Sequence, residues 1–226
     1  MRLCVILIIV QLVAGCGTSE RVDRPESGDA VVIERIDLPP PAVTGSGSLA
    51  DALARRRSVR EFQQVPLDLA EISQLLWAAQ GVTSSAGQRT APSAGGLYPL
   101  ELYLVTNRGR YHYDPDHHQL EFLGEDDVRG ELFRAALSQE AVQQAPAIFV
   151  LAAVYSRTEQ RYGDRAERYV KLEAGHVAQS LLLQAVSLGL GAVPIGAFHD
   201  DEVGEVLGLP DDHEPLYLIP VGHPAE

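Results

Sequence analysis

The chain has 226 residues, of which 46% are hydrophobic and 22% are charged, as is typical of a globular domain with a core. Its formal net charge of −13 argues against nucleic-acid binding, because the neutralisation of phosphates requires a basic surface. The only cysteines are Cys4 and Cys16, both near the start, which excludes a disulfide framework and a structural cysteine zinc site.

The start of the chain has the composition of an export signal. Arg2 precedes an apolar run over residues 3–10, which is shorter than the ~20 apolar residues that a membrane-spanning helix requires. Cys16 ends the sequence Leu-Val-Ala-Gly-Cys, which resembles the bacterial lipobox. The resemblance implies a lipoprotein signal peptide over residues 1–15 and acyl chains on Cys16. We therefore expect an exported, membrane-anchored lipoprotein at the periplasmic face or the cell surface.

Residues 16–47 contain the lipidated cysteine and a segment rich in Gly, Ser, Pro and charged residues, with little periodicity. This composition is typical of a flexible tether between a membrane and a domain. The sequence leaves open whether residues 31–36 form a short strand or arm. We expect the folded domain over residues 48–226.

From Ser48 onward the hydrophobic pattern alternates between helical and strand periodicity. It predicts helices over residues 49–56, 69–80, 126–137 and 167–188, and strands over residues 101–106, 110–113, 119–123, 147–154, 192–195 and 215–221. The long last helix is apolar almost all round from Val177 onward, so it must be covered on every side, within the domain or across a subunit interface. The mixture of a hairpin, long helices and short strands indicates an α+β fold.

No familiar catalytic motif or phosphate-binding loop is present. His112, His117 and His118 cluster around the predicted hairpin, and a solvated turn explains them better than a metal site, so we predict no metal. The remaining candidates are arginines, small residues and backbone-rich loops. Such groups are typical of a protein that holds a cofactor which performs the chemistry itself.

Four segments, in chain order, resemble the nitroreductase superfamily and, within it, the SagB-type dehydrogenases. They are Arg56-Arg57-Ser58-Val59-Arg60-Glu61-Phe62, then Ala91-Pro92-Ser93-Ala94-Gly95-Gly96-Leu97-Tyr98-Pro99, then Glu173-Ala174-Gly175-His176-Val177-Ala178-Gln179-Ser180 with its continuation through Pro194-Ile195-Gly196-Ala197-Phe198, and finally Pro220-Val221-Gly222-His223-Pro224. The resemblance implies a nitroreductase-like α+β fold, with a central, mostly antiparallel sheet flanked by helices. It also implies a homodimer with FMN bound across the interface.

The resemblance assigns cofactor-binding residues to each segment. They are Arg56, Arg57, Ser58, Arg60, Pro92, Ser93, Ala94, Gly95, Gly96, Pro194, Ile195, Gly196, Ala197 and His223. Arg56 and Ser58 would hold the phosphate and ribityl chain, and Arg60 the pyrimidine side of the ring, because guanidinium groups bind anions in a bidentate manner. The loop at 92–96 would reach the flavin of the other subunit, and a backbone N–H of residues 194–197 would point at flavin N5.

Two observations qualify the SagB resemblance. Ser180 stands where relatives usually have asparagine, and serine makes fewer hydrogen bonds than asparagine. The candidate acid–base groups are Tyr162, Tyr169 and Lys171, and the resemblance offers Tyr169 with Lys171 as the catalytic pair, although residues two apart on a helix do not share a face. The expected function is an FMN-dependent oxidoreductase that transfers hydride between a small-molecule or peptide substrate and flavin N5. A non-catalytic flavin- or ligand-binding lipoprotein with the same pocket is the alternative, and an interaction protein that has lost flavin is a third.

Overall fold

The structure, a computed structural model, describes residues 34–45 and 47–225. The expected signal peptide and the lipidation of Cys16 lie outside the described residues, as does most of the expected tether. Among the residues that are described, no helix is long and apolar enough to cross a membrane.

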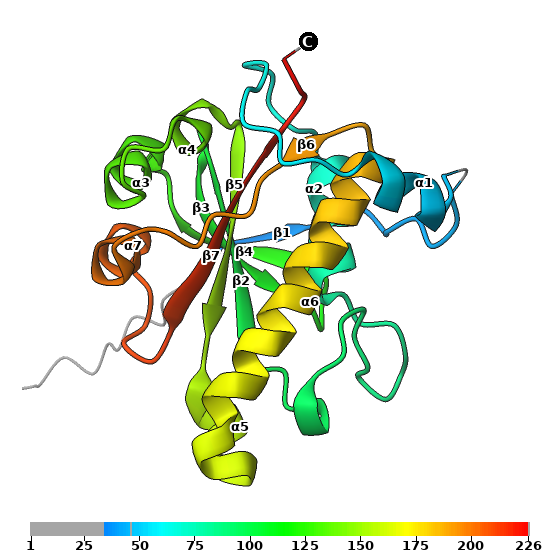
Figure 1. Cartoon of the computed structure of the whole chain (residues 1–226), viewed down its shortest axis with the longest axis vertical. Coiled ribbons are helices and arrows are strands. Elements are labelled where there is room, and N and C mark those ends of the chain that lie inside the picture. The colour runs from blue at the N-terminus through cyan, green and yellow to red at the C-terminus, as the bar shows by residue number, and fades with distance from the viewer. Residues whose placement is uncertain (1–33, 46, 226) are drawn as a thin grey trace, which may run out of the picture. The chain divides into compact units, whose positions relative to one another are not determined.

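Seven strands form one sheet (Figure 1). The strands are β1 (Arg35–Asp37), β2 (Leu100–Thr106), β3 (Gly109–Asp114), β4 (Gln119–Gly124), β5 (Ala147–Ala153), β6 (Gly191–Ala192) and β7 (Glu214–Gly222). Their order is β1-β4-β3-β2-β5-β7-β6, and all neighbouring pairs are antiparallel. The prediction of a mostly antiparallel sheet flanked by helices is confirmed.

The helices are α1 (Leu49–Arg55), α2 (Leu69–Gln80), α3 (Arg129–Ala135), α4 (Glu140–Gln144), α5 (Tyr155–Tyr162), α6 (Ala166–Ser187) and α7 (Asp200–Leu207), with 3-10 turns η1 (Ala94–Gly96) and η2 (Gly163–Arg165). The sequence predicted α1, α2, α3 and α6 to within a few residues but missed α4, α5 and α7. Those three helices are short and bury few side chains; α7, for instance, buries only Val203 and Leu207. Their apolar periodicity is therefore too brief to be recognised.

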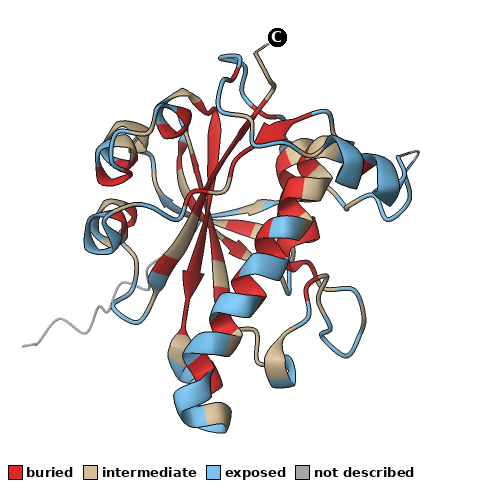
Figure 2. Ribbon diagram, viewed as in Figure 1, coloured by how far each residue is buried: buried red, intermediate tan, exposed pale blue. Residues whose placement is uncertain are grey.

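Helices cover both faces of the sheet (Figures 1 and 2). Side chains of α2 and α6, such as Leu76 and Leu181, pack with one face of the strands, and side chains of α3, α4 and α7 pack with the other. Every residue of β5 is buried, as expected of a central strand covered on both sides.

β1 lies ahead of the expected start of the domain. Arg35–Asp37 pair with Gln119–Glu121 of β4, and Leu38, which follows, is only 7% exposed. Ser73 Oγ of α2 donates a 2.6 Å hydrogen bond to the Pro39 carbonyl, which fixes the next residues against α2. The possible strand or arm near residues 31–36 is therefore a strand at the sheet edge, and the ordered domain includes residues 34–45.

The long helix α6 is covered on one face by this chain. Val170, Val177 and Leu181 on that face are fully buried, whereas Leu172 on the opposite face is 55% exposed. In the stretch from Val177 onward, for which coverage on every side was expected, the apolar side chains are buried or half-buried within this chain. The exposed apolar surface of α6 lies before that stretch, at Leu172. The open face remains available to a partner subunit.

Candidate functional site

The segment after α1 is held by β6. Ser48 caps α1 by accepting a 3.0 Å hydrogen bond from the Asp51 N–H, and the chain becomes extended at Arg56. Ser58 then forms a parallel bridge with Ala192, and the Val59 N–H donates to the Ala192 carbonyl at 3.0 Å. Because side chains alternate along extended backbone, Ser58 and Arg60 point to the side opposite Val59.

Val59 fixes this alternation by packing over Gly191. A Cβ added to Gly191 would lie 2.6 Å from Cγ1 of Val59, which is closer than real Cβ contacts come. Glycine at this position therefore lets the two segments approach, and their approach determines where Ser58 and Arg60 project.

The three predicted arginines have different surroundings. Nη1 of Arg57 donates to the carbonyls of Ala54 and Arg56, at 3.1 and 2.7 Å, so its guanidinium satisfies the C-terminal carbonyls of α1. Arg56 and Arg60 have no carboxylate partner among residues 34–45 and 47–225. In this segment, therefore, the guanidinium groups of Arg56 and Arg60 are available to bind an anion.

Residues 194–197 continue β6 along β7. The Ile195 N–H donates to the Leu218 carbonyl at 2.8 Å, and the Leu218 N–H donates back at 2.9 Å. Pro194 has no N–H. The N–H groups of Gly196 and Ala197 lie beyond the last hydrogen bond of this ladder, so they are the two in the predicted segment that remain to bind a ligand.

A cavity of about 340 Å³ joins Arg60 to this segment. It is lined by Arg60, Gln139, Glu140, Ala141, Val193, Pro194, Ile195, Gly196 and Ala197. Gln139 Nε2 donates to the Ala197 carbonyl at 2.8 Å and so holds the end of the segment. A Cβ on Gly196 would meet only Tyr217 at 3.7 Å, an ordinary contact, so the fold itself does not require glycine there.

His223 does not line this cavity and follows directly after the end of β7. Its carbonyl accepts from the Gln63 N–H at 2.9 Å, and its Nε2 lies 3.6 Å from Oε1 of Glu71. Glu71 also completes the capping box of α2 with Asp68. The structure therefore places His223 beside a carboxylate, on the segment that pairs with residues 61–63 directly after Arg60.

The loop at 92–96 lies near the other end of α6. Both Gly95 and Gly96 have φ of +66°, a conformation that favours glycine. A Cβ on Gly95 would lie 2.9 Å from Nη1 of Arg161 and 3.0 Å from Oη of Tyr162, both in α5. Figure 1 shows α5 at the N-terminal end of α6 and α1 at its C-terminal end.

The two groups of predicted residues do not meet within one chain. Arg55 contacts the carbonyl of Val186 near the C-terminal end of α6, whereas Ser93 and Ala94 lie beside Glu173. Thirteen residues of α helix separate Val186 from Glu173, or ~20 Å along the axis at ~1.5 Å per residue. A single site that uses both groups would need two chains.

Sequence reasoning did not single out Glu173 as a site residue. It is 3% exposed, its Oε1 has no hydrogen-bond partner among the described residues, and it lies beside the Ser93 hydroxyl and the Ala94 N–H. Burial raises the pKa of Glu173 to about 7, although Ser93 and the positive charge of Arg89 act in the opposite direction. The sequence did contain a signal for Glu173, because this glutamate falls on the same apolar face of the helix as Val170 and Val177.

Tyr169 and Lys171 diverge, as their spacing suggested. The Tyr169 ring packs edge-on against Tyr162, with centroids 5.1 Å apart, whereas Lys171 is exposed and pairs with Glu167 on the same helix. Tyr169 is therefore connected through Tyr162 to Gly95 of the loop. No comparable contact connects Lys171 to the loop.

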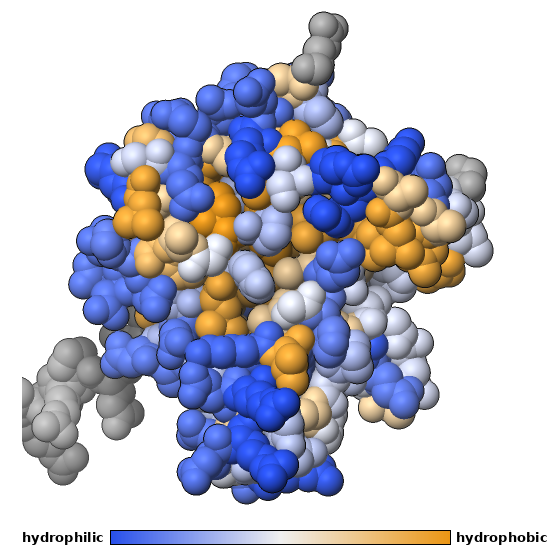
Figure 3. Space-filling model, viewed as in Figure 1, coloured by the Kyte–Doolittle hydropathy of each residue, from blue (hydrophilic) through white to orange (hydrophobic). Residues whose placement is uncertain are grey.

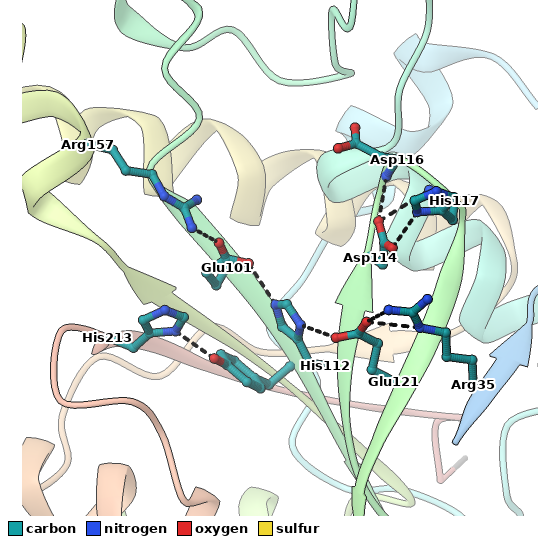
Figure 4. A network of polar contacts seen from close by, with 10 residues as sticks. Arg35, Glu101, His112, Asp114, Asp116, His117, Glu121, Arg157 and His213 are labelled. Atoms are coloured by element: carbon teal, nitrogen blue, oxygen red, sulfur yellow. Dashed lines mark hydrogen bonds and ion pairs between the residues drawn. The ribbon is translucent and has the colours of Figure 1, made fainter. Parts of the chain in front are cut away.

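The histidines near the hairpin take different partners. His112 lies between Glu101 and Glu121, with nitrogen–oxygen distances of 2.7 and 3.3 Å (Figure 4). Burial alone would lower the pKa of His112, but these carboxylates raise it. His117 contacts Asp114, and His118 contacts Tyr113 and the Pro39 carbonyl. Arg35 and Arg157 complete the chain of charges in Figure 4, which ties β1, β2, β3, β4 and α5 together.

The chain is similar to known proteins over most of the described range. A family model described as Nitroreductase family matches residues 53–223. A protein of Methanocaldococcus jannaschii, which its name places provisionally among the nitroreductases, is 46% identical over 184 residues, or 79% of this chain and 92% of that protein. The FMN reductase (NADPH) of Bacillus subtilis is 25% identical over 77% of this chain, and the match spans 65% of that enzyme.

The fold is also similar to a solved structure. A crystal structure from Ralstonia eutropha JMP134, provisionally described as a nitroreductase, superposes with a TM-score of 0.79. It is 36% identical and covers 85% of this chain and 90% of its own.

Proposed function

This chain belongs to the nitroreductase family, and from that membership we propose that it is an FMN-dependent oxidoreductase. It transfers hydride between a small-molecule or peptide substrate and N5 of the flavin. The observation that carries the proposal is the cavity that joins Arg60 to the backbone of residues 194–197. The similarity to the B. subtilis FMN reductase supports the choice of FMN.

The residues present fit a flat, phosphorylated cofactor. Gly196 has no side chain, although the protein around it leaves room for a Cβ atom. The backbone of Gly196 can therefore lie directly against a ring system. The N–H groups of Gly196 and Ala197 are available as donors, and Arg56 and Arg60 have no competing carboxylate in the part of the chain that the structure describes. Such a set of fixed donors and cations suits a ligand that carries negative charge.

Bound FMN would supply the hydride-accepting or hydride-donating atom. The contribution of the chain is electrostatic and is in place before reaction: the Gly196 or Ala197 N–H orients that atom, and Arg60 stabilises negative charge on the ring. Arg56 and Ser58 hold the phosphate end. Because the ladder with Leu218 fixes this segment, little reorganisation is required when the charge develops.

We propose a homodimer in which the loop at 92–96 of each chain covers the flavin of the other. The separation of the loop from Arg60 along α6 supports this arrangement. Leu49 and Leu53 of α1 are 66% and 54% exposed, and Figure 3 shows hydrophobic side chains gathered over α1. With Leu172 on the open face of α6, they supply apolar surface that a second chain would bury.

Gly196→Ala tests the cofactor site. The FMN-loaded parent should show a two-band visible spectrum, and a reductant and an acceptor should reduce and reoxidise the flavin at a catalytic rate. Gly196→Ala should fold as the parent does, because the new Cβ makes only an ordinary contact with Tyr217, yet bind FMN about tenfold more weakly or worse, because it adds bulk to a residue that lines the cavity. Gly204→Ala, in open space on α7, is the matched control. A parent that binds FMN without turnover would favour a flavin-binding protein, and one that binds none would contradict the proposal.

We further propose that the enzyme is a SagB-type relative, exported and anchored through Cys16. The support is the sequence alone: the lipobox-like residues before Cys16 and the segments at 91–99 and 173–180. NAD(P)H is scarce outside the cytoplasm, which favours the oxidation of a substrate and the passage of electrons outward. Cys16→Ser should move the protein from the membrane to the soluble fraction, and unchanged fractionation would contradict the anchor.

A further inference from the structure

Two arginines and two tyrosines form a connected group beside the loop at 92–96. Arg161 lies against Gly95, and its guanidinium is 5.6 Å from the centre of the Tyr162 ring. Tyr162 packs edge-on against Tyr169, and Arg165 approaches the Tyr169 hydroxyl. We call Arg161, Tyr162, Arg165 and Tyr169 the rim cluster.

The two cations of the rim cluster are not neutralised by the fold. Arg161 and Arg165 are exposed, and neither has a carboxylate partner within the described ranges. Arg157, one turn before Arg161 on α5, shows the contrast, because it pairs with Glu101 and its Nη1 donates to the Tyr98 carbonyl at 3.0 Å. Two unpaired arginines at one place are notable in a chain whose net charge is −13.

Structural support of the loop does not account for both arginines. Nη1 of Arg161 is 3.5 Å from the Gly95 carbonyl, which is a long and therefore weak hydrogen bond. Arg165 contacts Tyr169 and not the loop. Glu159 is two residues from Arg161 on α5, so it projects from a different face of the helix.

Resting on the proposed function, in which this loop covers the partner's flavin, we propose that the rim cluster binds the substrate as a planar organic anion. A carboxylate or similar group would lie on the guanidiniums of Arg161 and Arg165, which donate in a bidentate manner. The ring of the substrate would pack against Tyr162 and Tyr169, whose faces and edges suit aromatic partners. The cluster thus selects for negative charge at the mouth of the site.

Two probes of the same shape test this inference: 4-nitrobenzoate, which is an anion, and 4-nitrobenzamide, which is neutral. Each is titrated into the full chain loaded with FMN, and its Kd is read from the change in the visible flavin spectrum without reductant. We expect the parent to bind the acid about tenfold more tightly than the amide, with a preference that weakens as salt is added. The ratio of kcat/KM for the two compounds should follow the ratio of their Kd values.

The variants assign the preference to the rim cluster. The double variant Arg161→Gln and Arg165→Gln should lose the preference while its Kd for the amide stays near that of the parent. The double lysine variant, which keeps both charges, should retain most of the preference, and Arg134→Gln on α3 should behave as the parent does. Equal binding of acid and amide by the parent, binding of neither, or a preference that survives in the double glutamine variant would overturn the inference. A chain that binds no FMN would instead contradict the proposed function.

Discussion

At the C-terminal end of α6, the candidate site is built from backbone that is paired to the sheet. Ser58 bridges Ala192, and Ile195 exchanges two hydrogen bonds with Leu218. Near the N-terminal end of α6, side chains contact the loop at 92–96 instead. They are the buried Glu173, next to Ser93 and Ala94, and Arg161 and Tyr162, next to Gly95. We call these the anchor region and the loop region.

The difference in construction implies a difference in behaviour. No titratable group takes part in the backbone pairing of the anchor region, so its geometry should be insensitive to pH and should fail only when its packing is broken. The loop region depends on the charge of Glu173 and on flexible arginine side chains, so pH and single polar substitutions should change it gradually. A cofactor suits the first kind of support, and substrate exchange suits the second.

Gly191→Ala should break the anchor region and give the largest effect. The new Cβ would lie 2.6 Å from Cγ1 of Val59, so the segment that carries Ser58 and Arg60 must shift. We expect a loss of about 3 kcal/mol in the free energy of unfolding, at the upper end of overpacking effects. The affinity for FMN should fall about a hundredfold. Urea denaturation and flavin titration measure the two losses.

A second substitution shows whether the contact with Val59 is the cause. Val59→Ala removes the atoms that the new methyl group meets, so the double variant Val59→Ala with Gly191→Ala should recover most of the FMN affinity that Gly191→Ala loses. Additive losses in the double variant would mean that Gly191 acts in some other way, and the account of the anchor region would need revision.

The two regions also differ in how far the sequence could predict them. The residues of the anchor region follow from motifs and from local patterns, namely the Ser48 cap of α1, the arginine–serine segment after it and the short strand near Pro194. The sequence could not show that Arg57 turns to the carbonyls of α1, because that depends on side-chain rotamers at the helix end.

The loop region depends on contacts between distant parts of the chain. Glu173 meets Ser93 eighty residues earlier, and neither residue type nor local spacing indicates such a pairing. The sequence could not decide whether the edge strand β1 forms, for the same reason. Three residues are too few to show a hydrophobic period, and the strand depends on its pairing with the distant β4. Strand order likewise requires knowledge of which strands meet.

Glu173→Gln tests whether the loop region, unlike the anchor region, makes the stability of the protein depend on pH. The pKa of Glu173 is raised from 4.5 to about 7, so between these values the native state binds more protons than the unfolded chain. Stability should therefore fall as pH rises through this range, by about 3 kcal/mol in all. Glutamine resembles the protonated acid, so the variant should be more stable than the parent at pH 8 and equal to it at pH 4. Urea denaturation across this range measures the slope.

Two further measurements assign that slope to the loop region. Glu159→Gln, an exposed carboxylate on α5, should leave the pH dependence of stability as it is in the parent. In the FMN-loaded parent we expect the rate of flavin reduction to change in a step near pH 7, where Glu173 titrates, and Glu173→Gln should lack this step. FMN affinity, which the anchor region controls, should stay the same. A persistent step would show that another group holds the loop.

Gly95→Ala and Gly96→Ala should give the smallest effects, and their difference isolates the contact with α5. Both glycines have φ of +66°, so alanine costs about 1 kcal/mol of backbone strain at either position. Gly96 has open space where its Cβ would stand, whereas Gly95 faces Arg161 and Tyr162. We expect Gly95→Ala to lose about 0.5 kcal/mol more, a modest excess because the end of Arg161 is flexible. In an Arg161→Gln background the excess should vanish. If the excess loss persisted in that background, the contact between the new Cβ and Tyr162 would be its cause. Arg161 would then be fully available to a substrate.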